Sequence, residues 1–264
     1  RNTAVGFEVL QNLNFDGNGY NTAMGFQAGA AMTTGTENTI VGGLAGDALT
    51  TATFNTLIGK AAGGALTTGG YNVAIGGLAL DAEDEHGYNV AVGYAALTNQ
   101  NAGANAYNVA VGFNAGTAIT TGTANTLIGG LTGDALTEGA NNVLLGYDAG
   151  GSLTTGSENV AIGSYALKTE NVNGFNVAIG YSALEALDAG DNGYNVAIGY
   201  KAGEAMSTGT ENTIIGGLAG DALTTGVRNT AVGYLALSTE DAHSYNTAIG
   251  TYSLLALNAG ADGY

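Results

Sequence analysis

The sequence predicts an all-β protein, a parallel β-solenoid (β-roll) of fifteen coils that are 17 or 19 residues long. A motif recurs along the whole chain: Asn, then Thr or Val, then a small or aliphatic residue, then an aliphatic residue, then Gly. Its β-branched, period-two character is typical of strands rather than helices. Units this short cannot hold a helix together with a strand, and they must stack on one another to bury a core.

The spacing of the motif defines the coils and a longer repeat. Successive motifs are 17 residues apart, except for gaps of 19 after Asn2, Asn89 and Asn176. Blocks of five coils, 87 residues long, start at residues 21, 108 and 195. We therefore expect one solenoid domain over residues 1–264, as a segment of a longer chain. The motif Asn residues are Asn2, Asn21, Asn38, Asn55, Asn72, Asn89, Asn108, Asn125, Asn142, Asn159, Asn176, Asn195, Asn212, Asn229 and Asn246.

Each coil is expected to contain two strands and tight corners. In the coil that starts at Asn195, residues 196–198 predict a short strand that Gly199 ends, residues 202–206 a second apolar stretch, and residues 207–210 a turn. Asn suits a corner because it tolerates left-handed backbone and its amide can bond to the next Asn in a ladder. Gly suits a position with positive φ or close backbone contact.

Composition and charge exclude several classes of protein. The chain has 46 Gly but no Pro or Cys, which excludes collagen and disulfide frameworks, and 45% hydrophobic residues argue against disorder. The net charge of −17 disfavours nucleic acid and anionic membranes as partners. No apolar run approaches the ~18 residues of a membrane span, so no membrane insertion is expected in this segment.

The middle residue of each strand is never polar, which suggests a strand that is buried on both faces. A solenoid interior takes only one face, so we expect identical chains to associate laterally through the other, as a homotrimer or filament. A stripe of small Ala side chains tolerated on a monomer is the alternative. The middle residues expected in the interchain contact are Ile40, Leu57, Leu127, Leu144 and Ile214.

Catalytic chemistry has few candidates. His86 and His243 stand in acidic loops at equivalent places, which could hold a divalent ion. The equivalent loop 168–173 lacks the His and most of the acidic residues, so a turn is the better interpretation. The Asp-, Asn- and Gly-rich loops of the 19-residue coils also match plain turns better than calcium loops. We therefore expect no enzyme activity, no catalytic, cofactor or metal site, and no cofactor.

Aromatic residues recur at two positions beside the strands. In four successive coils an aromatic residue precedes the motif Asn, so these rings should stack as a ladder along one edge. The rings either clamp coil to coil or stack on sugars of host-surface glycans. The candidate glycan-stacking residues are Tyr71, Tyr88, Tyr107, Tyr181 and Tyr200.

The segment 176–184, Asn-Val-Ala-Ile-Gly-Tyr-Ser-Ala-Leu, resembles the head repeats of YadA-like trimeric autotransporter adhesins. The Thr-Thr-Gly turn at 154–156 is similar to repeats of phage tail-fibre and bacterial surface-fibre proteins. The resemblance covers the whole chain and implies a left-handed β-roll, a trimer, and an extracellular location on a cell surface or virion. The coils here are longer than those of the adhesin heads.

The expected function is therefore that of a structural fibre or adhesin segment, a repetitive rod for surface attachment. A phage tail-fibre shaft that binds host glycans is the first alternative. An ice-binding protein is a weaker one, because the repeated Thr-Thr pairs lie next to Gly in turns. The first and last coils carry ordinary strand motifs without a polar cap, so end-to-end stacking of copies is also expected.

Overall fold

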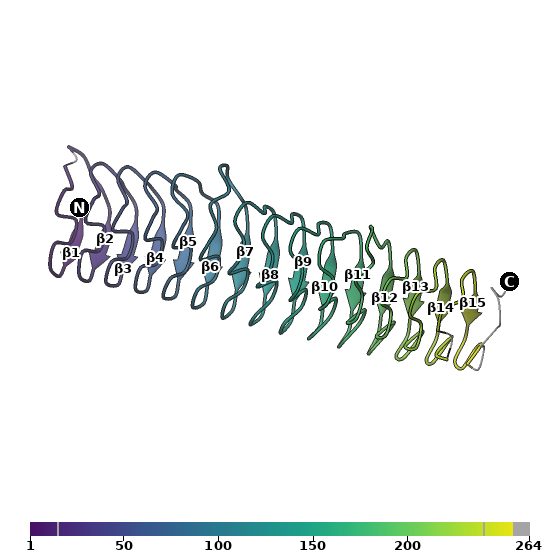
Figure 1. Cartoon of the computed structure of the whole chain (residues 1–264). Coiled ribbons are helices and arrows are strands. Elements are labelled where there is room, and N and C mark those ends of the chain that lie inside the picture. The colour runs from purple at the N-terminus through teal and green to yellow at the C-terminus, as the bar shows by residue number, and fades with distance from the viewer. Residues whose placement is uncertain (15, 240, 256–264) are drawn as a thin grey trace. The chain divides into compact units, whose positions relative to one another are not determined.

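The computed structural model describes residues 1–14, 16–239 and 241–255, and those residues form short β-strands and turns without a helix (Figure 1). One three-residue strand follows each motif Asn directly. The strands are β1 (Thr3–Val5), β2 (Thr22–Met24), β3 (Thr39–Val41), β4 (Thr56–Ile58), β5 (Val73–Ile75), β6 (Val90–Val92), β7 (Val109–Val111), β8 (Thr126–Ile128), β9 (Val143–Leu145), β10 (Val160–Ile162), β11 (Val177–Ile179), β12 (Val196–Ile198), β13 (Thr213–Ile215), β14 (Thr230–Val232) and β15 (Thr247–Ile249).

The chain forms two compact units, Arg1–Gly130 with β1–β8 and Leu131–Tyr264 with β9–β15. Within each unit, consecutive strands pair in parallel with equivalent residues in register, as Val73 with Val90 and Ile75 with Val92. The predicted parallel β-solenoid of tandem repeats is therefore confirmed in each unit. Its left hand and its extent as one domain over 1–264 stay predictions, and residues 256–264 lie outside the described part of the chain.

The expectation of two strands per coil was wrong. Residues 201–205 form a turn, which covers most of the predicted apolar stretch 202–206, and the backbone is left-handed at alternate positions, with φ of 55° at Lys201 and 61° at Gly203. Positive φ values bend the chain out of the extended conformation that a strand requires. This side of the coil still bonds to the next coil, because the Gly203 amide donates to the Ala219 carbonyl over 3.0 Å.

The five residues expected in an interchain contact lie in the core of a single chain instead. Each side chain is fully buried, and so are the Ala residues at the same position from Ala23 to Ala248. The motif Asn points inward, as its burial shows, so strand alternation turns the middle residue inward too. The first and third strand residues face outward. The assignment of Ile40, Leu57, Leu127, Leu144 and Ile214 to a contact between chains was therefore wrong.

Two interior positions of each coil, the middle strand residue and the residue six positions later, share one space in the core. Wherever the middle strand residue is Ile or Leu, the residue six positions later is Gly, and seven of the ten Ala coils carry Leu there. In the Leu57 coil, a Cβ on Gly63 would lie only 2.9 Å from Leu57 Cδ2. Close packing explains this pattern, because a narrow coil has room for one large side chain at this level. The five Gly partners are Gly46, Gly63, Gly133, Gly150 and Gly220.

A ladder of buried Asn side chains holds the coils together at one corner. The Asn72 amide donates to Asn55 Oδ1 over 2.9 Å, and Asn72 Nδ2 donates to the His86 carbonyl over 3.1 Å. The predicted ladder is thus confirmed. The sequence predicts left-handed backbone at the Asn, but positive φ occurs instead at the residue before it, such as Tyr71 with φ of 60°. Each Asn therefore satisfies buried backbone groups in two coils at once.

The Gly that ends each strand is required for both predicted reasons, a positive φ and close contact with neighbouring backbone. Gly76 has φ of 136°, and a Cβ there would lie 2.3 Å from the carbonyl oxygen of Gly93 in the next coil. No side chain fits in that space, and an L-residue would be strained by that backbone conformation. A column of Gly backbones in close contact therefore lies beside the outward strand residues.

Candidate interaction surface

The outward side of the strands forms one continuous surface in each unit, which we call the outer sheet face. It consists of four residues per coil: the residue before the motif Asn, the first and third strand residues, and the residue after the Gly. In the β6 coil these are Tyr88, Val90, Val92 and Tyr94. The third strand residue is aliphatic or Met and the first is Thr or Val in all fifteen coils, so the two central columns carry no charge.

An aromatic ladder runs along the Asn edge of the outer sheet face. The rings of Phe54, Tyr71, Tyr88 and Tyr107 stack with centroids 5.0, 5.1 and 5.3 Å apart. The planes are tilted by 5–25° from one another. This is the stacking that the sequence predicts, and the contacts stabilise the coils against one another.

A second set of stacked rings lies on the Gly edge and recurs with the long repeat. The stacked pairs are Phe7 with Phe26, Tyr94 with Phe113, and Tyr181 with Tyr200, at 5.7, 5.8 and 5.7 Å between centroids. Equivalent rings are 87 residues apart in the sequence. The sequence prediction names only Tyr residues at this position, and the spacing of Phe7, Phe26 and Phe113 is the signal that identifies the other rings.

The stacking limits what these rings can bind. Both faces of Tyr71 and Tyr88 lie against neighbouring rings, so a sugar can reach only their edges. Tyr107 ends the ladder, since the next coil has Ala124 at that position. Tyr181 and Tyr200 each have one face against the other ring, and Tyr181 also contacts the Tyr165 ring while Lys201 Nζ lies 5.8 Å from the centroid of the Tyr200 ring. Glycan stacking by these five residues stays a prediction, with Tyr107 the best placed.

The outer sheet face is large and apolar in a single chain. Six aromatic residues around β4–β7 remain 44–58% exposed. With roughly 200 Å² of surface per aromatic side chain, their exposed parts alone amount to about 600 Å². A contiguous apolar patch of this size is at the upper end for a monomer and marks an interaction site. The six residues are Phe54, Tyr71, Tyr88, Tyr94, Tyr107 and Phe113.

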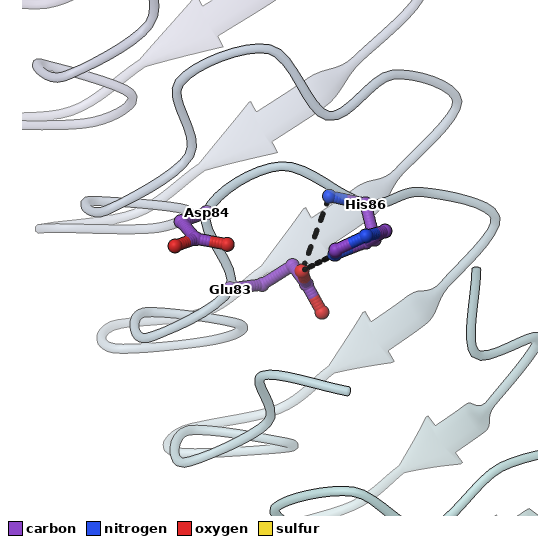
Figure 2. A group of neighbouring side chains, drawn as sticks. All are labelled: Glu83, Asp84 and His86. Carbon is purple, nitrogen blue, oxygen red and sulfur yellow. Dashed lines mark hydrogen bonds and ion pairs between the residues drawn. The ribbon is translucent and has the colours of Figure 1, made fainter. Parts of the chain in front are cut away.

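The acidic loop around His86 is an anchored turn. Glu83 is fully buried, and its Oε1 accepts the backbone amide of His86 over 3.2 Å and lies 3.4 Å from His86 Nδ1 (Figure 2). Gln100 Nε2 donates to Glu83 Oε2 over 3.3 Å. Burial raises the pKa of Glu83, and the hydrogen bond from the His86 amide opposes that rise.

Glu83, Asp84 and His86 offer three ligand atoms within 4.8 Å of one another. The expectation of a solvated turn was correct for the turn but wrong for Glu83, which is in the core. The loop with His243 is described only in part, because Glu240 lies outside the described residues; there the Asn229 side chain donates to the His243 carbonyl over 3.0 Å.

Comparison with protein families, with curated proteins and with solved structures found no match for this chain. Within the described residues, no helix is long and apolar enough to cross a membrane. The outer sheet face therefore has to be interpreted from its own chemistry.

Proposed function

We propose that this chain is a non-enzymatic, extracellular structural fibre or adhesin segment whose copies associate laterally through the outer sheet face. The observation that carries the proposal is the partial exposure of two uncharged columns, one of Thr and Val and one of aliphatic residues and Met, between two edges that carry stacked aromatic rings. A standard protein interface buries about 800 Å² on each partner, which this face can supply. The central columns have no charge to repel a second copy, although the chain carries −17 overall.

A homotrimer with left-handed coils is the assembly that the resemblance to adhesin heads implies, and we include it in the proposal. The corrected burial pattern changes which residues would meet. The contact would involve first and third strand residues, such as Val73, Ile75 and Val92, and not the buried middle residues.

The test is the oligomeric state of a variant with Ile75→Lys and Val111→Lys, measured by sedimentation over a range of protein concentrations. Both residues face outward, and Lys reduces the net negative charge, so loss of association would not result from added repulsion. We expect the natural chain to associate and the variant to sediment as a monomer. Asn101→Lys, on an exposed loop, is the matched control and should associate normally. A monomeric natural chain, or a variant that associates equally well, contradicts the proposal.

A second candidate function is recognition of host-surface glycans, as in a phage tail-fibre shaft. It is favoured by the exposed Tyr107, whose ring ends a ladder beside the small Ala124. Tyr107→Ala should then abolish binding on a glycan array, whereas Tyr88→Ala should weaken it less. Ice binding is less well supported, because the hydroxyls of Thr33, Thr50 and Thr67 donate to carbonyls of the following coil.

A further inference from the structure

Two buried carboxylates interrupt an apolar column of the core. The residue eleven positions after the motif Asn is Met, Leu or Ile in most coils and fully buried, but it is Glu83, Gln100 and Glu170 in three described coils, also fully buried. Each of these Glu residues belongs to the coil directly before a 19-residue coil. Glu240 holds the same place in the sequence but lies outside the described residues. Among the described residues, the fully buried apolar members of the column are Met32, Leu49, Leu66, Ile119, Leu136, Leu153, Leu187, Met206 and Leu223.

The Glu side chain replaces a hydrogen bond between coils. In two of the regular coils, the amide three residues further on donates to a carbonyl of the next coil: Gly35 to Thr50 over 3.3 Å and Gly139 to Thr154 over 3.4 Å. Before a 19-residue coil the corresponding amide donates to the Glu instead: Asn173 donates to Glu170 Oε1 over 3.2 Å. The following amide, of Gly174, donates to Asn192 Oδ1 of the 19-residue coil over 3.2 Å. At the boundary between the β10 coil and the 19-residue β11 coil, which we call the seam, hydrogen bonds to side chains therefore take the place of backbone–backbone hydrogen bonds.

Glu170 lies in a less favourable environment than Glu83. The next coil offers Gln100 as a donor to the second oxygen of Glu83, but it has Leu187 at the same place after Glu170. Among the described residues, neither Glu170 Oε2 nor the neighbouring Asn173 Nδ2 has a hydrogen-bond partner. Burial raises the pKa of Glu170, opposed by the amides of Asn173, Ala189 and Asn171 and by the Asn173 side chain, and no charged group is among these influences.

Lys168, the nearest cationic side chain along the chain, is engaged elsewhere, since its Nζ lies 3.0 Å from Asp148 Oδ2. An ionised Glu170 would therefore be a buried charge without a counter-ion, which proteins tolerate poorly. A neutral Glu170 keeps an oxygen that can accept the Asn173 amide without that cost.

We infer that Glu170 makes the seam between the β10 and β11 coils a proton-sensitive joint, closed when the carboxyl is neutral and loosened when it ionises. The folded state favours the protonated form. The stability it contributes is fully present below the pKa of an unfolded Glu, ~4.3, and is lost as the pH rises through the higher folded value. The joint would let the loop of the 19-residue coil open without unfolding of the remaining coils.

The test is hydrogen exchange of residues 168–193 at pH 5 and pH 8, corrected for the intrinsic rate and read by mass spectrometry. We expect opening of this segment in the natural chain to increase at least about tenfold at pH 8, the change that one unit of pKa shift produces. Glu170→Gln, a neutral isostere, should hold the change below about twofold. Leu187→Gln supplies the donor that Gln100 provides at the other seam and should reduce the change several-fold.

Asp191→Asn is the matched control. Asp191 is an exposed carboxylate in the same loop, and the variant keeps the oxygen that accepts the Asn192 amide, so it should respond to pH as the natural chain does. An equal response in the natural chain and Glu170→Gln, or no response in the natural chain, overturns the inference. If Glu170→Gln does not fold, an unchanged response in Leu187→Gln overturns it equally.

Discussion

At the scale of single residues, the Gly that ends each strand differs in its tolerance of a side chain from a Gly at the next position, such as Gly43. Gly76 stands in a column where the next backbone is too close for any side chain, whereas a Cβ on Gly43, on the outer sheet face, would have no atom within 4 Å. The two positions therefore distinguish a structural requirement of the coil from a small residue on its surface.

Gly76→Ala should destabilise the chain by about 3 kcal/mol, combining backbone strain of ~1–3 kcal/mol with the displacement of the Gly93 carbonyl. Gly43→Ala should change the free energy of unfolding by less than about 0.5 kcal/mol, as for an ordinary surface substitution. Urea unfolding followed by circular dichroism measures both. Equal effects of the two substitutions would show that the close contact in the Gly column does not limit stability.

At the scale of one coil, the two interior positions that share a volume define a packing rule. The rule predicts that a large residue can move from the strand to the facing turn within one coil. Leu is accepted at the turn position with positive φ, as Leu80 shows with φ of 53°.

Leu57→Ala should cost ~2–5 kcal/mol by leaving a cavity, and Gly63→Leu should cost ~1–3 kcal/mol by overpacking. The double variant reproduces the Ala74–Leu80 arrangement of the next coil and should be more stable than Leu57→Ala alone. A double-mutant cycle of unfolding free energies should give a coupling of at least about 1.5 kcal/mol. Additive effects would contradict this packing rule.

This rule also shows what could be predicted from the sequence. The Asn-to-Gly spacing predicts every strand directly, because corner residues and β-branched residues are local signals. The inward face was assigned wrongly, because Ala suits either face and the inward direction of the Asn is a tertiary fact. The pairing of Leu57 with Gly63 in one coil, and of Ala74 with Leu80 in the next, is the signal in the sequence that shows which strand residue faces the interior.

Other features had no local signal in residue type. Left-handed backbone occurs at residues as different as Leu44, Tyr165 and Lys201, because neighbouring coils impose it. The burial of Glu83 is visible only when the coils are aligned so that it falls in the column of Leu66. Both depend on contacts between coils, which a single repeat does not contain.

At the scale of the whole molecule, the free energy of unfolding should increase with the number of coils that stack in register. Each coil bonds mainly to its two neighbours, so a solenoid behaves as a row of repeats with nearest-neighbour contacts. A deletion is tolerated when the new neighbours match those that were removed.

Removal of residues 108–194, one block of five coils, joins Tyr107 to Asn195 and recreates the junction between Tyr107 and Asn108. We expect a folded chain with an unchanged circular dichroism signal per residue and a melting temperature within a few degrees of the natural chain. Removal of 108–186 leaves half a coil without a motif Asn and should misfold. Similar behaviour of the two deletions would argue against coil-by-coil assembly.

The stacked rings also give the protein an internal optical probe. The chain has 14 Tyr, six Phe and no Trp, so Tyr dominates its ultraviolet emission. Ring pairs such as Tyr71 with Tyr88, 5.1 Å apart, are close enough for their electronic transitions to couple, which gives the near-ultraviolet circular dichroism a component that depends on stacking. Separation of neighbouring coils would remove that component and change the Tyr emission. Spectra of the unlabelled protein would therefore report the separation of coils that carry stacked rings.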